Sequence, residues 1–582
     1  MRAKLHLPFD QEVLDMGGRS RSQGAGPDRR GPLILLLLVL AAVALVLAAA
    51  LVACGEAETP SGTETSTGRT LQITTPSADG MVDEITWDLP NGEPMGVNPL
   101  RSGDESSCLI SSQLHDTLVR YSPDWTMVPG IAESWEYVDD LTLVFQLRKD
   151  ATFWDGNPVT ASDVVFSLQR NMDPATGTYW MAFYSNVKSI EETGPWEVTV
   201  RFSKPDEMLL KELGTSAGGI VEKAYVQKVG EMKYGSGMNV MGSGPYELVS
   251  WVSGSEMVLQ ANNNYWDPSL RPKVQTIRVK FFTDTSTITN GLLSGEIDGA
   301  YIVPPPSIPE LSAASNGKLY FGPSLMVHEV CFAKPTGLLG ENPAVRRALS
   351  MAMDRKAIAE KVFRGAAQPN KTLTPPTAWD PEALDVYKTA YAEIPGDEPD
   401  IEGAKALLEG QTGLDKPLIM GFIAGNQLEL ELASIVQQAA KDIGLTVELK
   451  QMQSMDVTNF WFDAKYREGL DMAVSPGWLD VPDPLDYTGY FLGSFDEGAI
   501  FNFIDYRNAE VEDNLELARQ TVDPIERANL IVDAQEIYTH DTVLIPLTTD
   551  DTILFMNNRI SGAPVSFPYM WCGSLAMIGG TQ

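Results

Sequence analysis

A run of 21 consecutive apolar residues, 33–53, decides where the rest of this 582-residue chain can fold. Arg29 and Arg30 precede the run, and small residues lead from its end to a single cysteine, Cys54. About 20 apolar residues can span a bilayer as a helix, so length alone also allows a retained transmembrane segment. Secretory signals share the basic start, the apolar stretch and the small residues before a cleavage site. Both interpretations place everything after Cys54 outside the cytoplasm.

The small residues and the cysteine at the end of the run favour cleavage. The pattern resembles the lipobox of bacterial lipoprotein signal peptides, in which the cysteine receives a diacylglyceryl group and becomes the new N-terminus. The resemblance implies a signal peptide over residues 1–53 and a lipid anchor on Cys54, on the outer face of the cytoplasmic membrane. Residues 54–75 are rich in Gly, Ser, Thr, Pro and Glu, and they predict a flexible linker behind the anchor.

The negative charge of the chain argues against some classes of binding partner. The formal net charge is −35, and so acidic a surface repels nucleic acid and anionic lipid. The length left after the signal peptide is too great for one small core and predicts two or three domains. We expect a soluble body that works as a monomer.

Cysteine and histidine usage favours neither a metal site nor a cofactor. Beyond Cys54 the cysteines lie far apart, at Cys108, Cys331 and Cys572, and allow at most one disulfide and one free thiol. No paired-ligand spacing occurs around the widely separated histidines, so His115, His328 and His540 are predicted to be structural or surface residues. We therefore expect no cofactor, no metal and no catalytic residue.

Periodic patterns predict an α/β protein. Leu141, Leu143, Phe145 and Leu147 alternate as in a strand with one buried face. A capping box at 160–163 opens a predicted helix over 161–172. Further helices are predicted over 108–121, over 428–443 and from a second capping box at 523–526 to about 538, with short strands at 446–449 and 543–547.

One block resembles a known family. It contains Ala-Glu-Ser-Trp at 132–135, Leu-Arg at 147–148, Asp-Gly at 155–156 and Asp-Val-Val-Phe-Ser at 163–167. In this order these motifs are similar to the signature region of family 5 solute-binding proteins of ABC transporters, the oligopeptide, dipeptide and nickel type. Later stretches continue the likeness, at 242–248, 263–266, 292–298 and 345–355.

The resemblance implies a two-lobed periplasmic-binding-protein-like fold with an extra subdomain in the first lobe. Lobe I would comprise 76–112, 216–325 and 545–582, the extra subdomain 113–215 and lobe II 326–544. Two strand-like crossings, near 324–329 and 542–547, would form the hinge on which the lobes close around a solute. The closed protein would present that solute to an ABC permease with its ATPase subunits.

The predicted ligand site lies in residues 477–487, which read as a loop with two prolines, three acids and two aromatic residues. In oligopeptide- and dipeptide-binding members of the family, a Gly-Trp segment is followed by an Asp that receives the ligand's α-ammonium and then by Asp-Pro. The resemblance assigns these positions to Trp478, Asp480 and Asp483. Charge-assisted hydrogen bonds from an ammonium to a carboxylate are strong enough for this task. Alternatively, Asp483, Asp486 or no carboxylate at all faces the ligand; in the last case Asp480 and Asp486 cap turns and Asp483 packs beside Pro484.

Peptide capture is therefore the predicted function. Within the same fold the solute could instead be a sugar, an opine or a metal chelate. An extracellular hydrolase is an alternative of another class, but no nucleophile motif such as GxSxG accompanies the scattered histidines. A sensory or adhesive lipoprotein that keeps the fold without transport is a further alternative.

Overall fold

The computed structural model describes residues 69–90, 92–453, 456, 459–461, 463–493, 500–568, 571 and 574–581. The predicted signal peptide, Cys54 and Cys572 lie outside these residues. Within the part of the chain that is described, no helix is long and apolar enough to cross a bilayer. Residues 69–75, at the end of the predicted linker, are bonded to the body, because the amide of Gln72 donates to Phe321 and that of Thr75 to Ala563.

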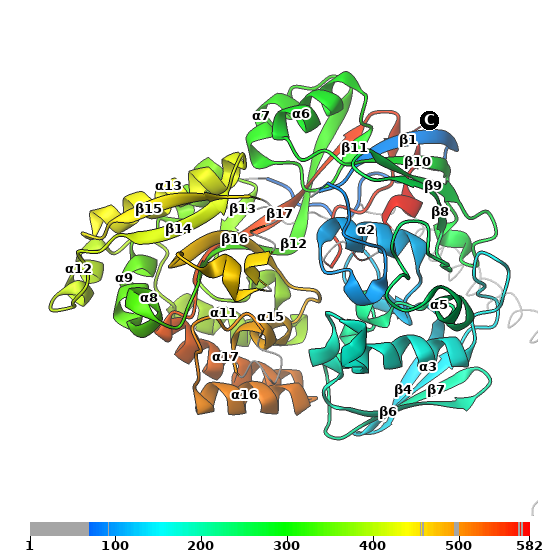
Figure 1. Cartoon of the computed structure of the whole chain (residues 1–582), viewed down its shortest axis with the longest axis horizontal. Coiled ribbons are helices and arrows are strands. Elements are labelled where there is room, and N and C mark those ends of the chain that lie inside the picture. The colour runs from blue at the N-terminus through cyan, green and yellow to red at the C-terminus, as the bar shows by residue number, and fades with distance from the viewer. Residues whose placement is uncertain are drawn as a thin grey trace, which may run out of the picture. The chain divides into compact units, whose positions relative to one another are not determined.

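A mixed sheet of 11 strands runs through the fold (Figure 1). Its order is β15-β14-β16-β12-β17-β11-β1-β10-β9-β8, with β13 beside β17. On one side of the centre lie β11 (Gly299–Ala300), β1 (Val82–Asp88), β10 (Val274–Lys280), β9 (Glu256–Ala261) and β8 (Tyr246–Val252). On the other lie β16 (Met472–Trp478), β14 (Leu418–Ile423) and β15 (Val447–Met452), with β13 (Ala367–Pro369).

The central pair, β12 (Gly317–Phe332) and β17 (Ile545–Asn557), joins the two sides of the sheet. The two strands run antiparallel from Gly317 opposite Asn557 to Val330 opposite Ile545, with register shifts on the way. The pattern predicted only short crossings here. The strand β17 is much longer than the predicted one. Nearly all its residues are buried, so no alternation of apolar and polar residues marks its length in the sequence.

A second sheet has the order β4-β5-β7-β6, formed by β4 (Ala132–Asp139), β5 (Thr142–Leu147), β7 (Glu197–Phe202) and β6 (Val187–Gly194). The predicted strand is confirmed in β5, except that Leu141 lies before it and is 40% exposed. Helix α3 (Ala161–Gln169) begins at the predicted capping box. Thr160 accepts from the amide of Asp163, whose carboxylate accepts from the amide of Thr160 at 3.1 Å.

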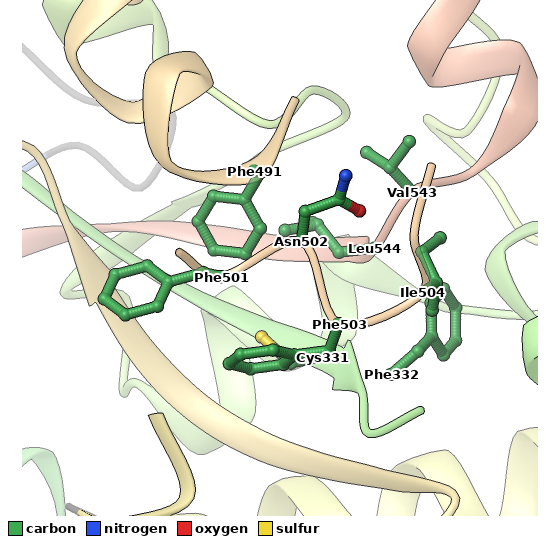
Figure 2. A pocket seen from close by; sticks show the side chains of 9 residues that line it. All are labelled: Cys331, Phe332, Phe491, Phe501, Asn502, Phe503, Ile504, Val543 and Leu544. Carbon is green, nitrogen blue, oxygen red and sulfur yellow. The ribbon is translucent and has the colours of Figure 1, made fainter. Parts of the chain in front are cut away.

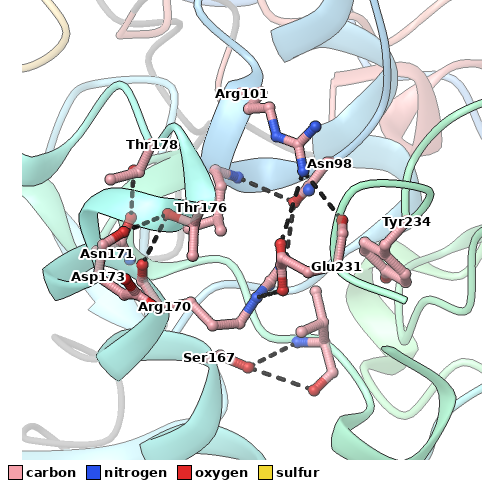
Figure 3. A network of polar contacts seen from close by, with 12 residues as sticks. Asn98, Arg101, Ser167, Arg170, Asn171, Asp173, Thr176, Thr178, Glu231 and Tyr234 are labelled. Carbon is pink, nitrogen blue, oxygen red and sulfur yellow. Dashed lines mark hydrogen bonds and ion pairs between the residues drawn. The ribbon is translucent and has the colours of Figure 1, made fainter. Parts of the chain in front are cut away.

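A network of polar contacts fastens the end of α3 to the segments that hold Asn98, Arg101 and Glu231, outside the strands of the main sheet (Figure 3). Arg170, at the end of α3, donates to both carboxylate oxygens of Glu231, at 2.9 and 2.7 Å, and to the side chain of Asn98 at 3.2 Å. Arg101 donates to the carbonyl of the same Glu231 at 3.0 Å. Because Arg170 is 5% exposed, this is a buried anchor between the two parts.

Several predicted helices are confirmed, as α13 (Gln427–Asp442) and α17 (Pro524–Asp541). The helix predicted over 108–121 is wrong at both ends, because α2 spans Glu105–Leu114 and is capped by Asp104. The last three residues of the predicted helix form β2 (Val119–Tyr121), which pairs with β3 (Met127–Pro129). Tertiary pairing with a later segment overrides the local helical pattern there.

The loop predicted over 477–487 is shorter than expected. Strand β16 continues through Trp478, and helix α15 (Pro484–Phe491) begins directly after Asp483. Proline suits the first turn of a helix, where its missing N–H would have no partner. Only residues 479–483 are irregular, and they hold Asp480 and Asp483 between a strand and a helix.

Candidate functional site

The carboxyl group of Asp480 is buried where three distant stretches of the chain meet. The residue is 1% exposed. The hydroxyl of Tyr490 donates to Asp480 Oδ2 at 3.2 Å, while Oδ1 has no hydrogen-bond partner among the described residues. Burial raises the pKa of this carboxyl to about 7, against the lowering effect of the Tyr490 hydroxyl. An unsatisfied buried acceptor is costly, and such costs are concentrated at functional sites.

Two further acids stand beside Asp480. Asp486, in the first turn of α15, accepts the backbone amide of Asp480 at 2.6 Å and so holds the loop in place. Glu212, at the end of α4 (Leu209–Glu212), brings its carboxyl within hydrogen-bonding reach of Asp486. Burial, Asp486 and Asp480 raise the pKa of Glu212 well above its ordinary value. Burial and Asp480 likewise raise the pKa of Asp486.

Asp483 has a different environment, although it is as buried as Asp480. Both of its oxygens accept from Arg527 Nη2, each at 2.7 Å, and Lys211 pairs with Oδ2. Oδ1 also caps α15 by accepting the amide of Leu485 at 2.9 Å. Burial alone would raise the pKa of Asp483, but Arg527 and Lys211 outweigh it and lower the pKa below its ordinary value. Its charge is thus balanced within the protein.

Aromatic rings surround the acid loop. The ring centroid of Tyr490 lies 5.7 Å from that of Tyr179 and 5.7 Å from that of Phe183. Trp478 is the last residue of β16, half-buried and opposite Met326 of β12. The rings of Tyr179 and Tyr490 provide flat apolar contact next to the carboxylates, as a solute with a charged end and an apolar body requires.

An apolar pocket opens one ring away from Tyr490 (Figure 2). Phe501, which lies 5.4 Å from Tyr490 between ring centroids, is one of its walls. The remaining lining residues are Cys331, Phe332, Phe491, Asn502, Phe503, Ile504, Val543 and Leu544. The pocket measures about 10 Å³, close to the space of one water molecule. Apart from Asn502 its lining side chains are apolar or weakly polar, which suits an apolar group.

A larger pocket of about 200 Å³ lies beside the C-terminal end of α2, between the β2–β3 hairpin and the turn after β9. Its charged lining is satisfied by the protein itself. Asp116 accepts from Tyr265 Oη at 2.6 Å and from Trp266 Nε1 at 2.9 Å, and Arg120 donates to Asp267 at 2.7 Å. We therefore place the candidate site at Asp480, where several buried carboxyl oxygens have no hydrogen-bond partner among the residues described.

The described histidines have partners away from Asp480 or lie at the surface. His115 contacts Tyr234 at 2.9 Å, His328 contacts Asp550 at 2.6 Å and His540 is exposed. Cys108 and Cys331 are buried free thiols. Within the described ranges no group of three His, Cys, Asp or Glu side chains has the arrangement of a metal site.

Sequence reasoning located Asp480, Asp483 and Trp478, and named Asp486 as an alternative acid facing the ligand, but it missed Glu212, Tyr490 and Tyr179 as parts of the same site. Glu212 carries no local signal, because it follows Leu209 and Lys211 in an ordinary short helix. Only the fold, which brings residue 486 back beside residue 212, shows that these carboxyl groups lie together.

The comparisons with known proteins agree with this architecture. Residues 126–499, more than half of the chain, match the model of the bacterial extracellular solute-binding proteins, family 5. The chain belongs to this family. The resemblance inferred from the motifs at 132–167 is thereby confirmed. Family 5 proteins bind solutes for ABC transporters outside the cytoplasm, which favours solute binding over the hydrolase alternative.

Relatives within family 5 are named for, or were solved with, different solutes. The glutathione-binding protein GsiB of Escherichia coli O1:K1 is 24% identical over 470 residues, which are 80% of this chain and 89% of GsiB. The structure of DppA from Helicobacter pylori with the peptide STSA has a TM-score of 0.76 at 21% identity, covering 86% of this chain and 99% of DppA. AgaA from A. tumefaciens R10, solved with agropinic acid, has a TM-score of 0.75 at 21% identity, with the same coverage. These structures show that the fold is the two-lobed one of the family.

Proposed function

We propose that this protein captures peptides outside the cytoplasm by binding their N-terminal ammonium at Asp480. The observation that carries the proposal is the buried Oδ1 of Asp480, which lacks a partner among the described residues. An ammonium supplies the three donors and the positive charge that this oxygen and its surroundings lack. Tyr179 and Tyr490 then contact the apolar part of the solute, and Trp478 extends this surface.

The capture mechanism is closure of two lobes. We assign lobe I to 76–112, 216–325 and 545–582, the extra subdomain to 113–215 and lobe II to 326–544. The strands β12 and β17 connect the lobes and act as the hinge. Two ion pairs with buried carboxylates and partly exposed cations bridge the subdomain and lobe II, Lys211 with Asp483 and Asp206 with Arg519, the latter at 2.7 Å. These pairs form only when the lobes meet, so they hold the closed state that a permease receives.

Asp483 belongs to this closing contact in our proposal. Its two cations leave its carboxylate little capacity for a solute, whereas Asp480 carries no ion pair among the described residues. Direct solute contact by Asp483 stays a prediction.

Calorimetry tests the amine assignment. We expect a tripeptide such as Ala-Ala-Ala to bind and its N-acetylated form to lose about tenfold or more in affinity, the equivalent of one charge-assisted hydrogen bond. The Asp480→Asn variant should lower the affinity for the free peptide toward that of the acetylated one. Equal affinities of wild-type protein for both peptides would refute amine recognition.

Attachment to the membrane is the second part of the proposal. The lipobox pattern at residues 51–54 supports a diacylglyceryl anchor, whose two acyl chains give stable attachment where one chain gives only marginal binding. We expect the Cys54→Ser variant to be released into the medium or to remain uncleaved, as fractionation and mass spectrometry would show. A variant that is processed and membrane-bound like the wild type would contradict the anchor.

A further inference from the structure

Three carboxyl groups at the site lack a cationic partner among the described residues, and we call Glu212, Asp480 and Asp486 the carboxyl triad. Each is 0 or 1% exposed. A buried carboxylate without a partner is expensive, whereas the same group paired with a cation is tolerated. The triad could therefore bind a positive charge that the described residues do not supply.

Amine binding at Asp480 does not explain why the carboxyl group of Glu212 is buried without a partner among the described residues. Within the described ranges it is the one carboxyl group with two buried oxygens that both lack a hydrogen-bond donor. Two other buried acids, by contrast, each accept from a donor: Glu329 accepts from Tyr487 at 2.6 Å, and Glu429 accepts from the amide of Ile423 at 2.6 Å. The carboxyl of Glu212 instead faces that of Asp486, and two acceptors can approach each other only if they share a proton.

The charge balance gives the size of the unfilled capacity. Asp483 and the triad place four carboxylates near two cations, Arg527 and Lys211, and Glu207 interacts with the same two cations, so at least two negative charges remain when all acids are ionised. The ammonium that we assign to Asp480 offsets one of them. The second is offset either by the proton shared between Glu212 and Asp486 or by a second positive charge on the solute.

We propose that Glu212 and Asp486 form a second cation subsite beside Asp480, so that this protein prefers solutes with two positive charges at one end, such as a peptide beginning with lysine. This inference rests on the proposed function, because the first charge is the ammonium at Asp480. When the second cation enters, it replaces the shared proton, which leaves for the solvent. Glu212 comes from α4 and Asp486 from α15, so the second cation also bridges the subdomain and lobe II.

Calorimetry with two tripeptides tests the subsite. The wild-type protein should bind Lys-Ala-Ala about tenfold more tightly than Ala-Ala-Ala, since one additional charge-assisted contact is made. The Glu212→Gln variant should lose this preference, so that it binds the two tripeptides within about threefold of each other, and a cooperative thermal melt like that of the wild type shows that it is folded. Glu516→Gln, which removes a half-exposed carboxylate paired with Lys204, is the matched control and should keep the preference.

Proton release gives a second readout. Titrations in buffers of different ionisation enthalpy should show more proton released with Lys-Ala-Ala than with Ala-Ala-Ala by the wild type and no such difference for Glu212→Gln, because any proton that Asp480 loses to the ammonium is released with both peptides. The titratable groups that face Glu212 are Asp480, Asp483, Asp486, Tyr121, Tyr184 and Tyr490. Burial raises the pKa values of the three tyrosines among them, which stay protonated near neutral pH. The released proton therefore comes from the acids.

The outcomes separate the two proposals. Equal affinities for the two tripeptides in the wild type, or an undiminished preference in Glu212→Gln, overturn the second subsite and leave peptide capture standing. Binding of neither tripeptide overturns peptide capture at Asp480 and the second subsite with it.

Discussion

Replacing Arg527 by methionine should destabilise the protein strongly, because it leaves Asp483 with one cation in place of two. Arg527 is 4% exposed and donates to both oxygens of Asp483 at 2.7 Å. Methionine keeps the apolar volume that packs near Met208, so the change removes charge more than packing.

The expected loss is about 3–5 kcal/mol at pH 7, the usual cost of breaking a buried ion pair by removing one partner. Coulomb attraction at an effective dielectric constant near 20 gives a similar size, about 4 kcal/mol for unit charges 4 Å apart. Lys211 still pairs with Asp483 and keeps the loss toward the lower end. The sign with pH follows from the lowered pKa of Asp483: its contribution is present above the unfolded-state pKa near 4 and is lost as pH falls. The difference between variant and wild type should therefore shrink in acid.

Urea unfolding at pH 7 and at about pH 3 measures this loss and its decrease in acid, and a double-mutant cycle with Asp483→Asn isolates the pair. Lys204→Met is the control, because it breaks the exposed pair with Glu516 and should cost under about 1 kcal/mol. A loss under about 1 kcal/mol for Arg527→Met, or additive effects in the cycle, would show that the pair does not stabilise the fold as reasoned.

Three further predictions concern other parts of the fold. Burial raises the pKa of several acids to about 7, so the folded state holds protons that the unfolded state loses above pH 4.5, and the free energy of unfolding should fall by up to about 1.4 kcal/mol per pH unit for each acid as pH rises toward 7. These acids are Asp88, Glu329, Glu429 and Asp551. Urea titrations at pH 5 and pH 7.5 check the slope, and greater stability at pH 7.5 would contradict it. Thr160→Ala should cost about 1 kcal/mol by removing the cap of α3, and a loss indistinguishable from zero would count against the capping box. Gly477→Ala should lower the melting temperature and disturb the acid loop, since a methyl group there would overlap the hydroxyl of Tyr487; unchanged stability and peptide affinity would contradict that packing.

Local patterns in the sequence determined much of the secondary structure. The capping box at Thr160, the helix α13 and the cap of α17 at Asp523 were visible because side-chain spacing and end caps act over only a few residues. The motifs at 132–167 pointed to the family, and the comparisons confirm it.

Local patterns did not predict the extent of strands that are buried on both faces. Strand β17 was recognised only at its start because a strand covered on both sides has no polar alternation to mark its length. The extension of the predicted helix into β2 failed for a related reason, since β2 is decided by its partner β3 and not by its own spacing.

The candidate site divides in the same way. The sequence by itself placed Trp478, Asp480 and Asp483 in one short stretch, because neighbours along the chain stay neighbours in space. Only the tertiary structure decided that Asp483 is neutralised by Arg527 and Lys211 while Asp480 is not. It also brought Glu212 to Asp486 across more than 270 positions of the chain. Such long-range pairings depend on how strands and helices pack, and charges acquire their pKa values from that packing, so no local pattern encodes them.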